Sequence, residues 1–209
     1  MGGPAALSTR YCRSAGRNPP RTPIRGLHRS RSRVTPGTGR ALLTGARFRA
    51  LIRAMIIVDP ADPHDPGPRA LLEASHALMR SLFPAEANHF LSLDALAAPG
   101  IHVFAARRGA AVLGVGALAE KDGYGELKSI HVDEGARGSG VADALMRQLE
   151  DQARALGLPL LRLETGSLLQ AAHRLYARHG FRRCGPFGDY AACDQSVFME
   201  KPLADAVGH

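Results

Sequence analysis

The chain has 209 residues, of which 27 are lysine or arginine and 19 are aspartate or glutamate, giving a formal charge of +8. Its three cysteines are too few and too odd in number for a disulfide framework, and no apolar run approaches the roughly 20 residues that a membrane helix needs. We therefore expect a cytoplasmic protein, and we expect neither a secreted disulfide scaffold nor a membrane-spanning chain.

The basic charge is concentrated in residues 1–54. This segment contains twelve arginines and no lysine, aspartate or glutamate, so residues 55–209 hold 15 basic and 19 acidic groups, a formal charge of about −4. Proline, glycine and arginine with little periodicity predict a disordered leader. Three interpretations fit it: an organellar transit peptide, a basic arm for nucleic acid, or sequence upstream of a true start at Met55. We favour the third, because an apolar strand begins directly after Met55.

Residues 55–203 have the length of one domain with a full core, and residues 204–209 are a tail. The elements predicted for the first half, in chain order, are a strand over 56–60, a helix from Pro68 that carries Leu71, Leu72, Leu78, Met79 and Leu82, a helical segment over 85–97, and a hairpin of strands over 101–106 and 111–119.

A glycine-rich loop then stands between a strand and a helix. Residues 127–133 alternate in strand fashion, and apolar residues recur at helical spacing from Val141 for about four turns. The first turn of a helix has unpaired N–H groups and a partial positive charge, which favour an anion. Gly138 and Gly140 let a phosphate approach the backbone, and Arg137 adds a positive charge. We therefore expect a phosphorylated cofactor at this loop.

The known nucleotide motifs do not fit this loop. No Gly-Lys-Ser/Thr follows it, as a triphosphate-binding loop requires, and Asp143 stands where the dinucleotide motif has its third glycine. Taken alone, the loop is also compatible with a tight strand-to-helix turn. The segments that follow decide between these interpretations.

The second half continues the alternation of strands and helices. Residues 160–165 predict a strand, and Ser167 with Gln170 forms a capping-box pattern for a helix that stops at Gly180. Phe181 begins the next strand, and residues 196–200 form the last one.

This order of elements, with two motifs in register, resembles the GCN5-related N-acetyltransferase (GNAT) superfamily. Arg137, Gly140 and Ala142 fill the family pattern Gln/Arg-x-x-Gly-x-Gly/Ala, which binds the pyrophosphate of acetyl-CoA. Residues 175–181 match the family ending Leu-Tyr-x-x-x-Gly-Phe. The resemblance covers roughly residues 55–203. It implies an α/β (α+β) fold: a mixed, mostly antiparallel twisted sheet of roughly six to seven strands with about four helices, splayed between strands 4 and 5.

The resemblance implies an acetyl-CoA-dependent N-acetyltransferase in which a primary amine attacks the thioester directly, within a ternary complex. Tyr176 matches the general acid that protonates the leaving thiolate, although a core tyrosine explains it too. Glu126 is the candidate base, and Glu164 is the reserve. The implied cofactor-binding residues are Ile130, His131, Val132, Arg137, Gly138, Ser139, Gly140, Val141, Ala142 and Thr165. Thr165 or Ser167 replaces the asparagine that the family has after its fifth strand.

Candidate substrate contacts lie in two loops. Phe83 and His89, with Asn88 and Phe90, belong to the loop that walls the acceptor pocket in this fold, and Asp189 and Tyr190 lie in the turn before the last strand. Loop packing and an Asx turn explain the same residues. The acceptor itself, whether a small amine or a peptide, stays open.

We expect no metal site, because no histidines cluster, and neither a membrane nor nucleic acid as a partner of the domain. Two other functions stay open. One is an acyl-CoA sensor without transfer, and the other is a nucleic-acid or ribosome-associated protein that uses the arginine arm. A homodimer is also open, because the last strands of such domains often pair.

Overall fold

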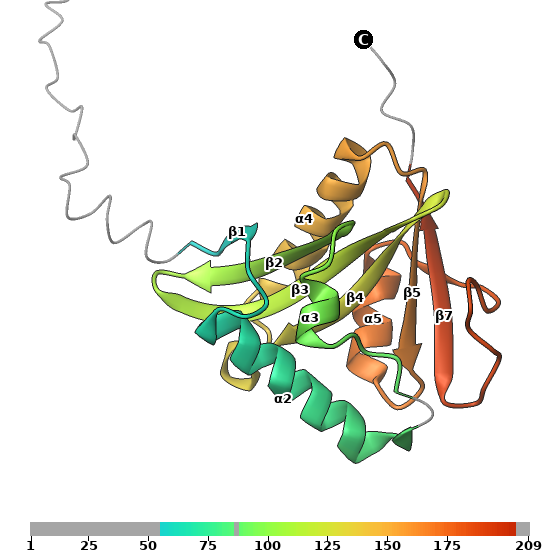
Figure 1. Cartoon of the computed structure of the whole chain (residues 1–209), viewed down its shortest axis with the longest axis horizontal. Coiled ribbons are helices and arrows are strands. Elements are labelled where there is room, and N and C mark those ends of the chain that lie inside the picture. The colour runs from blue at the N-terminus through green and yellow to red at the C-terminus, as the bar shows by residue number, and fades with distance from the viewer. Residues whose placement is uncertain (1–54, 86–87, 204–209) are drawn as a thin grey trace, which may run out of the picture. The chain divides into compact units, whose positions relative to one another are not determined.

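The computed structural model of this chain describes residues 55–85 and 88–203. The predicted leader (1–54) and tail (204–209) lie outside the described residues. The rest forms a seven-stranded sheet with helices on both faces (Figure 1). The strands are β1 (Ile57–Pro60), β2 (Ile101–Arg108), β3 (Ala111–Lys121), β4 (Tyr124–Val132), β5 (Leu160–Gly166), β6 (Arg182–Arg183) and β7 (Ser196–Pro202). The helices are α2 (Pro66–Leu82), α3 (Leu93–Leu96), α4 (Val141–Ala155) and α5 (Gln170–Arg178), with a 3-10 turn, η2 (Glu134–Ala136).

The sheet is mixed and mostly antiparallel, as predicted. The strands lie in the order β1-β2-β3-β4-β5-β7-β6, and every neighbouring pair is antiparallel except β4 and β5. The parallel pair exists because α4 crosses over between these two strands. The predicted fold class is confirmed.

Each face of the sheet has its own core. In β2, Phe104 and Ala106 belong to the cluster that packs against α4 and α5, whereas Val103 and Ala105 belong to the cluster under α2 and α3. Side chains of a strand point alternately to opposite faces, so an apolar run such as 103–106 fills both cores at once. This arrangement places β4 and β5 in a sheet that has helices on both faces (Figure 1).

The two central strands diverge part of the way along their length. Ladder pairing between β4 and β5 covers Gly125–Leu127 opposite Leu161–Leu163 and goes no further, although both strands continue. Just past this point the register of β3 with β4 shifts, and Ser129 adopts a left-handed φ of 53°. The bulge bends β4 away from its neighbour and leaves part of its backbone unpaired. The predicted splay is confirmed.

Two local predictions were wrong. Gln170 Nε2 donates to the Ser167 carbonyl, and the N-cap of α5 is Leu169 without a side-chain cap, so no capping box forms. Within the described part of 85–97, the expected α-helix is confined to α3, where Ser92 Oγ accepts a hydrogen bond from the Ala95 N–H. Residues 88–90 and 168–170, which belong to these two segments, line a cavity, and tertiary packing can override a local pattern.

A buried carboxylate joins the C-terminal strand to α4. Glu150 of α4 is 6% exposed, and its Oε2 lies 2.7 Å from Lys201 Nζ and 3.2 Å from Arg154 Nη2. His179, at the end of α5, lies within 3.4 Å of Glu150 and 3.0 Å of Asp143. These ion pairs fix the relative position of α4, α5 and β7.

Replacing Lys201 with methionine is expected to lower the free energy of unfolding by about 3 kcal/mol, because it leaves the Glu150 carboxylate buried without its nearest cation. Urea denaturation measures the loss. Arg69→Met is the control: its partner Glu73 is half-exposed, so that change should cost less than about 1 kcal/mol. Equal losses in the two variants would contradict the role of the buried pair.

Candidate active site

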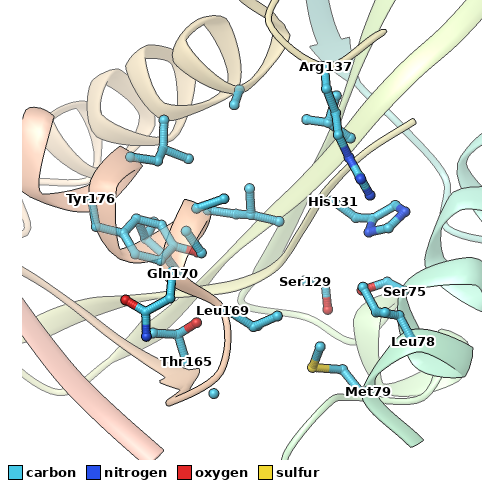
Figure 2. A pocket seen from close by; sticks show the side chains of 18 of the residues that line it. Ser75, Leu78, Met79, Ser129, His131, Arg137, Thr165, Leu169, Gln170 and Tyr176 are labelled. Atoms are coloured by element: carbon cyan, nitrogen blue, oxygen red, sulfur yellow. The ribbon is translucent and has the colours of Figure 1, made fainter. Parts of the chain in front are cut away.

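A cleft opens where β4 and β5 diverge. Its volume is about 900 Å³, and its walls come from α2, β4, the η2–α4 loop, the end of β5 and α5. Figure 2 shows Arg137 and His131 at one end of the cleft, Met79 and Thr165 at the other, and Tyr176 facing it from α5. The cleft therefore connects the glycine loop with the segment that was predicted to wall the acceptor.

The glycine loop forms a cradle at the head of α4. Gly138 and Gly140 have φ values of 74° and 86°, both line the cleft, and a Cβ at either position would meet no atom within 4 Å. The helix has no side-chain cap, so the N–H groups of its first turn face the cleft without a side-chain acceptor. Arg137 stands at the rim, 3.0 Å from Glu134. Such a cradle suits a diphosphate.

Most of the predicted cofactor-binding residues meet at this cleft. Ser139 is the exception, because its hydroxyl donates to the Ala136 carbonyl and its side chain does not line the cleft. The residues that do line it are Ile130, His131, Val132, Arg137, Gly138, Gly140, Val141, Ala142 and Thr165.

Burial lowers the pKa of His131, and the positive charge of the nearby Arg137 lowers it further, so the imidazole is held neutral.

Ser129 is a site residue that the sequence did not reveal. It lies at the bulge of β4, it lines the cleft, and its Oγ is buried without a hydrogen-bond partner in the described part of the chain. It is also the one non-glycine residue with a positive φ within residues 55–85 and 88–203. An unpaired buried hydroxyl on a strained backbone is typical of a ligand-binding position.

Tyr176 belongs both to the core and to the cleft. It is 7% exposed, its ring centroid lies 6.0 Å from that of Phe181, and it lines the cleft from α5 (Figure 2). Burial, and to a lesser degree the charge of Glu164, raises the pKa of its phenol. The hydroxyl therefore stays protonated through the neutral range and is available to donate a proton.

Glu126, the predicted base, lies beneath the wall of the cleft. The carboxylate is 4% exposed and does not line the cleft. Its Oε1 accepts a hydrogen bond of 2.5 Å from the Tyr190 hydroxyl and lies 3.1 Å from Lys128 Nζ. Burial, and then this bond to Glu126, raises the pKa of Tyr190. Lys128 thus separates Glu126 from the cleft.

Glu164, the reserve candidate, faces the cleft directly. It is half-buried at the end of β5, and its charge contributes to the raised pKa of both Tyr176 and Tyr190, so it lies near both phenols. Two other carboxylates line the cleft, and both have arginine partners: Glu134 pairs with Arg137, and Asp143 with Arg178. Glu164 has no such partner among the described residues.

The predicted acceptor contacts divide into two groups. Phe83 and His89 line the cleft, with Phe83 packed so closely over Gly166 that a Cβ there would lie 2.2 Å from its ring. Tyr190 contacts Glu126 and Lys128, and its ring meets His89 edge-on at 5.2 Å. Asp189 is exposed and is not part of the wall. Lys128 is a second wall residue that the sequence did not reveal.

Two further properties concern the described residues as a whole. Within residues 55–85 and 88–203, no group of three or more His, Cys, Asp or Glu side chains is arranged to hold a metal ion. None of the helices in these ranges has the length and apolar character needed to cross a membrane.

Known proteins resemble this chain over more than half of its length. The model of the Acetyltransferase (GNAT) family matches residues 69–181. A curated relative named IAA acetyltransferase, from Azospirillum brasilense, is 44% identical over 135 residues, which are 64% of this chain and 88% of the relative. A Klebsiella pneumoniae structure described as an acyl-CoA N-acyltransferase is 32% identical, with a TM-score of 0.61 over 72% of this chain and 99% of that one.

A third similar protein was solved with a ligand. It is a GNAT family acetyltransferase from Elizabethkingia anophelis with acetyl-CoA bound, with a TM-score of 0.53 over 71% of this chain and 98% of that one. Its sequence identity is 19%, so this likeness concerns the fold alone.

Proposed function

Since this chain belongs to the GNAT acetyltransferase family, we propose that it transfers the acetyl group of acetyl-CoA to a primary amine by direct attack within a ternary complex. One observation carries the proposal. A single cleft contains an anion cradle at α4, the unpaired edge of β4, a protonated phenol and a carboxylate that has no cationic partner within residues 55–85 and 88–203. These groups are what binding a CoA thioester and moving two protons require.

Binding of acetyl-CoA would use the cradle and the open strand edge. The N–H groups at the head of α4 and the Arg137 side chain bind the diphosphate, in the space that Gly138 and Gly140 leave free. The amides of the pantetheine arm pair with β4 at Ile130–Val132, where the ladder with β5 has ended. The thioester then lies in the middle of the cleft, next to Ser129 and Tyr176.

The chemical step forms one bond and breaks one. The amine nitrogen attacks the thioester carbonyl carbon, and collapse of the tetrahedral intermediate breaks the C–S bond. Unpaired N–H groups at the β4 bulge stabilise the negative charge on the carbonyl oxygen. Tyr176 donates its proton to the departing thiolate. The proton that the nitrogen loses after the attack restores the Tyr176 phenol, and a carboxylate takes the proton that an ammonium acceptor loses before the attack.

We assign this last role to Glu164, because its carboxylate faces the cleft, whereas that of Glu126 lies behind Lys128. Glu126 then acts by holding Lys128 and Tyr190 in place. The difference can be measured, because an ammonium acceptor must give a proton to the base before its nitrogen can attack. At a pH above the pKa of the acceptor, the free amine attacks without it.

Glu164→Gln is expected to lower kcat/KM roughly tenfold or more near neutral pH, with recovery as the pH rises through the pKa of the acceptor amine. Thiol release from acetyl-CoA, with the acetylated amine identified by mass, measures the rate. Glu126→Gln is the matched variant, and any loss it causes should not recover with pH. Recovery with rising pH in Glu126→Gln but not in Glu164→Gln would assign the base to Glu126. Absence of thiol release with every amine would favour a sensor and contradict the proposed function.

A further inference from the structure

The end of the cleft away from the α4 cradle, which we call the acceptor end, has mainly apolar walls. They are formed by Leu78, Met79, Leu82, Phe83, Phe90 and Leu168. Leu168 is 61% exposed and Leu82 is 38% exposed, although both are large apolar side chains. An exposed pair of leucines at the mouth of a cavity is typical of a site that receives an apolar group.

Among the described residues, Lys128 is the one lysine or arginine that lines the acceptor end, since Arg80 stacks over the Phe90 ring from outside the lining, and all N–H donors of the Lys128 ammonium are engaged. Its Nζ lies 3.1 Å from Glu126 Oε1, 2.6 Å from the Tyr190 hydroxyl and 3.3 Å from the His89 carbonyl. An ammonium has three N–H donors, so these partners use all of them. Its charge is also neutralised by Glu126. Lys128 therefore has neither a donor nor a net charge to offer a substrate carboxylate.

The remaining titratable groups at the acceptor end are His89 and Glu164. The His89 ring packs edge-on against Tyr190. Glu164 is the one carboxylate in the cleft without an arginine or lysine partner in the described residues, so it leaves a single negative charge there. One such charge in a partly apolar cavity suits one ammonium group and repels an anion.

From this balance of charges we infer that the acceptor is a monoamine with an apolar body and no carboxylate. The inference rests on the proposed function and specifies its substrate class. The amine meets Glu164, and the apolar body lies against the leucine, methionine and phenylalanine side chains of α2 and the segment after it. A carboxylate or a second ammonium on the body would be buried without a partner.

Three acceptors of equal chain length test the inference: hexylamine, 6-aminohexanoate and 1,6-diaminohexane. They differ only in an apolar, anionic or cationic terminus. In thiol-release assays, kcat/KM for hexylamine should exceed that for each of the other two at least about tenfold, because a charged end loses its hydration in this cavity. An equal or higher value for 6-aminohexanoate or diaminohexane would overturn the inference.

Glu126→Gln gives a second test, because it keeps the shape of the side chain and removes the charge that neutralises Lys128. The ratio of kcat/KM for hexylamine to that for 6-aminohexanoate should fall about tenfold. Glu73→Gln, in an exposed ion pair with Arg69, is the control and should leave the ratio unchanged. An unchanged ratio in Glu126→Gln would contradict the saturation of Lys128.

Leu82→Lys keeps the test valid if Glu126→Gln does not fold. Leu82 is partly exposed at the end of α2, so a lysine there adds a cation at the mouth without being buried. The same ratio should fall again, and a ratio that stayed constant would count against the inference. Failures are distinguishable: transfer with the wrong preference refutes the substrate class alone, whereas no thiol release with any of the three amines refutes the proposed function as well.

Discussion

Tyr176→Phe should lower kcat about 100-fold and leave the Kd for CoA unchanged, because the variant keeps the ring and loses only the proton donor. Without a donor, the sulfur must leave as a thiolate inside a partly apolar cleft. The ring packs against Phe181 and the α4 layer, so phenylalanine preserves the core. Thiol-release assays measure kcat, and calorimetric titration with CoA measures the Kd.

The pH profile gives this prediction a second observable. Because burial raises the pKa of Tyr176, ionisation of this phenol should cause no loss of wild-type kcat as the pH rises from neutrality to about 10, the pKa of a free tyrosine. Tyr124→Phe is the matched control, since Tyr124 starts β4 outside the cleft and should keep full activity. If Tyr176→Phe kept kcat and lost only stability, Tyr176 would be a core residue without a role in transfer.

The features that the sequence predicted are those that depend on neighbouring residues. Gly138 and Gly140 mark the cradle because both have left-handed φ values, which glycine adopts without strain. The apolar runs that fill two cores mark the central strands, and the helical spacing from Val141 marks α4. Each of these properties is set by a few consecutive residues, so composition and periodicity are enough to find it.

The features that the sequence could not predict depend on distant residues. Tyr190 lies 62 positions from Lys128 and 64 from Glu126, and its contacts with both arise only when the turn before β7 folds over β4. The bulge at Ser129 leaves no mark in the sequence, because the residues of β4 around it still alternate as in a regular strand. The failed capping box at Ser167 also involves a distant residue, since Phe83 packs over Gly166 and the Ser167 N–H donates to the Gln195 carbonyl.

A second large effect, on the Kd for CoA, is expected when Gly140 in the cradle is replaced with alanine. Gly140→Ala places a methyl group where the diphosphate is proposed to lie, and it strains a residue whose φ is 86°. Loss of one charge-assisted hydrogen bond to the diphosphate corresponds to a rise in Kd of roughly 10- to 100-fold. The methyl group meets no protein atom within 4 Å, so the variant should still fold.

Gly157, at the other end of α4, provides a control that distinguishes backbone strain from an effect on ligand binding. It has a φ of 70° and equally open space around its Cβ, but it does not line the cleft. Gly157→Ala should therefore lose about as much stability as Gly140→Ala, on the order of 1 kcal/mol, without any effect on a ligand at the cradle. Thermal unfolding of both variants checks that the two losses match.

Calorimetric titration of CoA into the wild type, Gly140→Ala and Gly157→Ala decides whether the head of α4 binds the diphosphate. We expect tight binding to the wild type and to Gly157→Ala, and a Kd at least about tenfold higher for Gly140→Ala. Equal Kd values for the two variants, or no binding of CoA to the wild type, would contradict binding of the diphosphate at the head of α4.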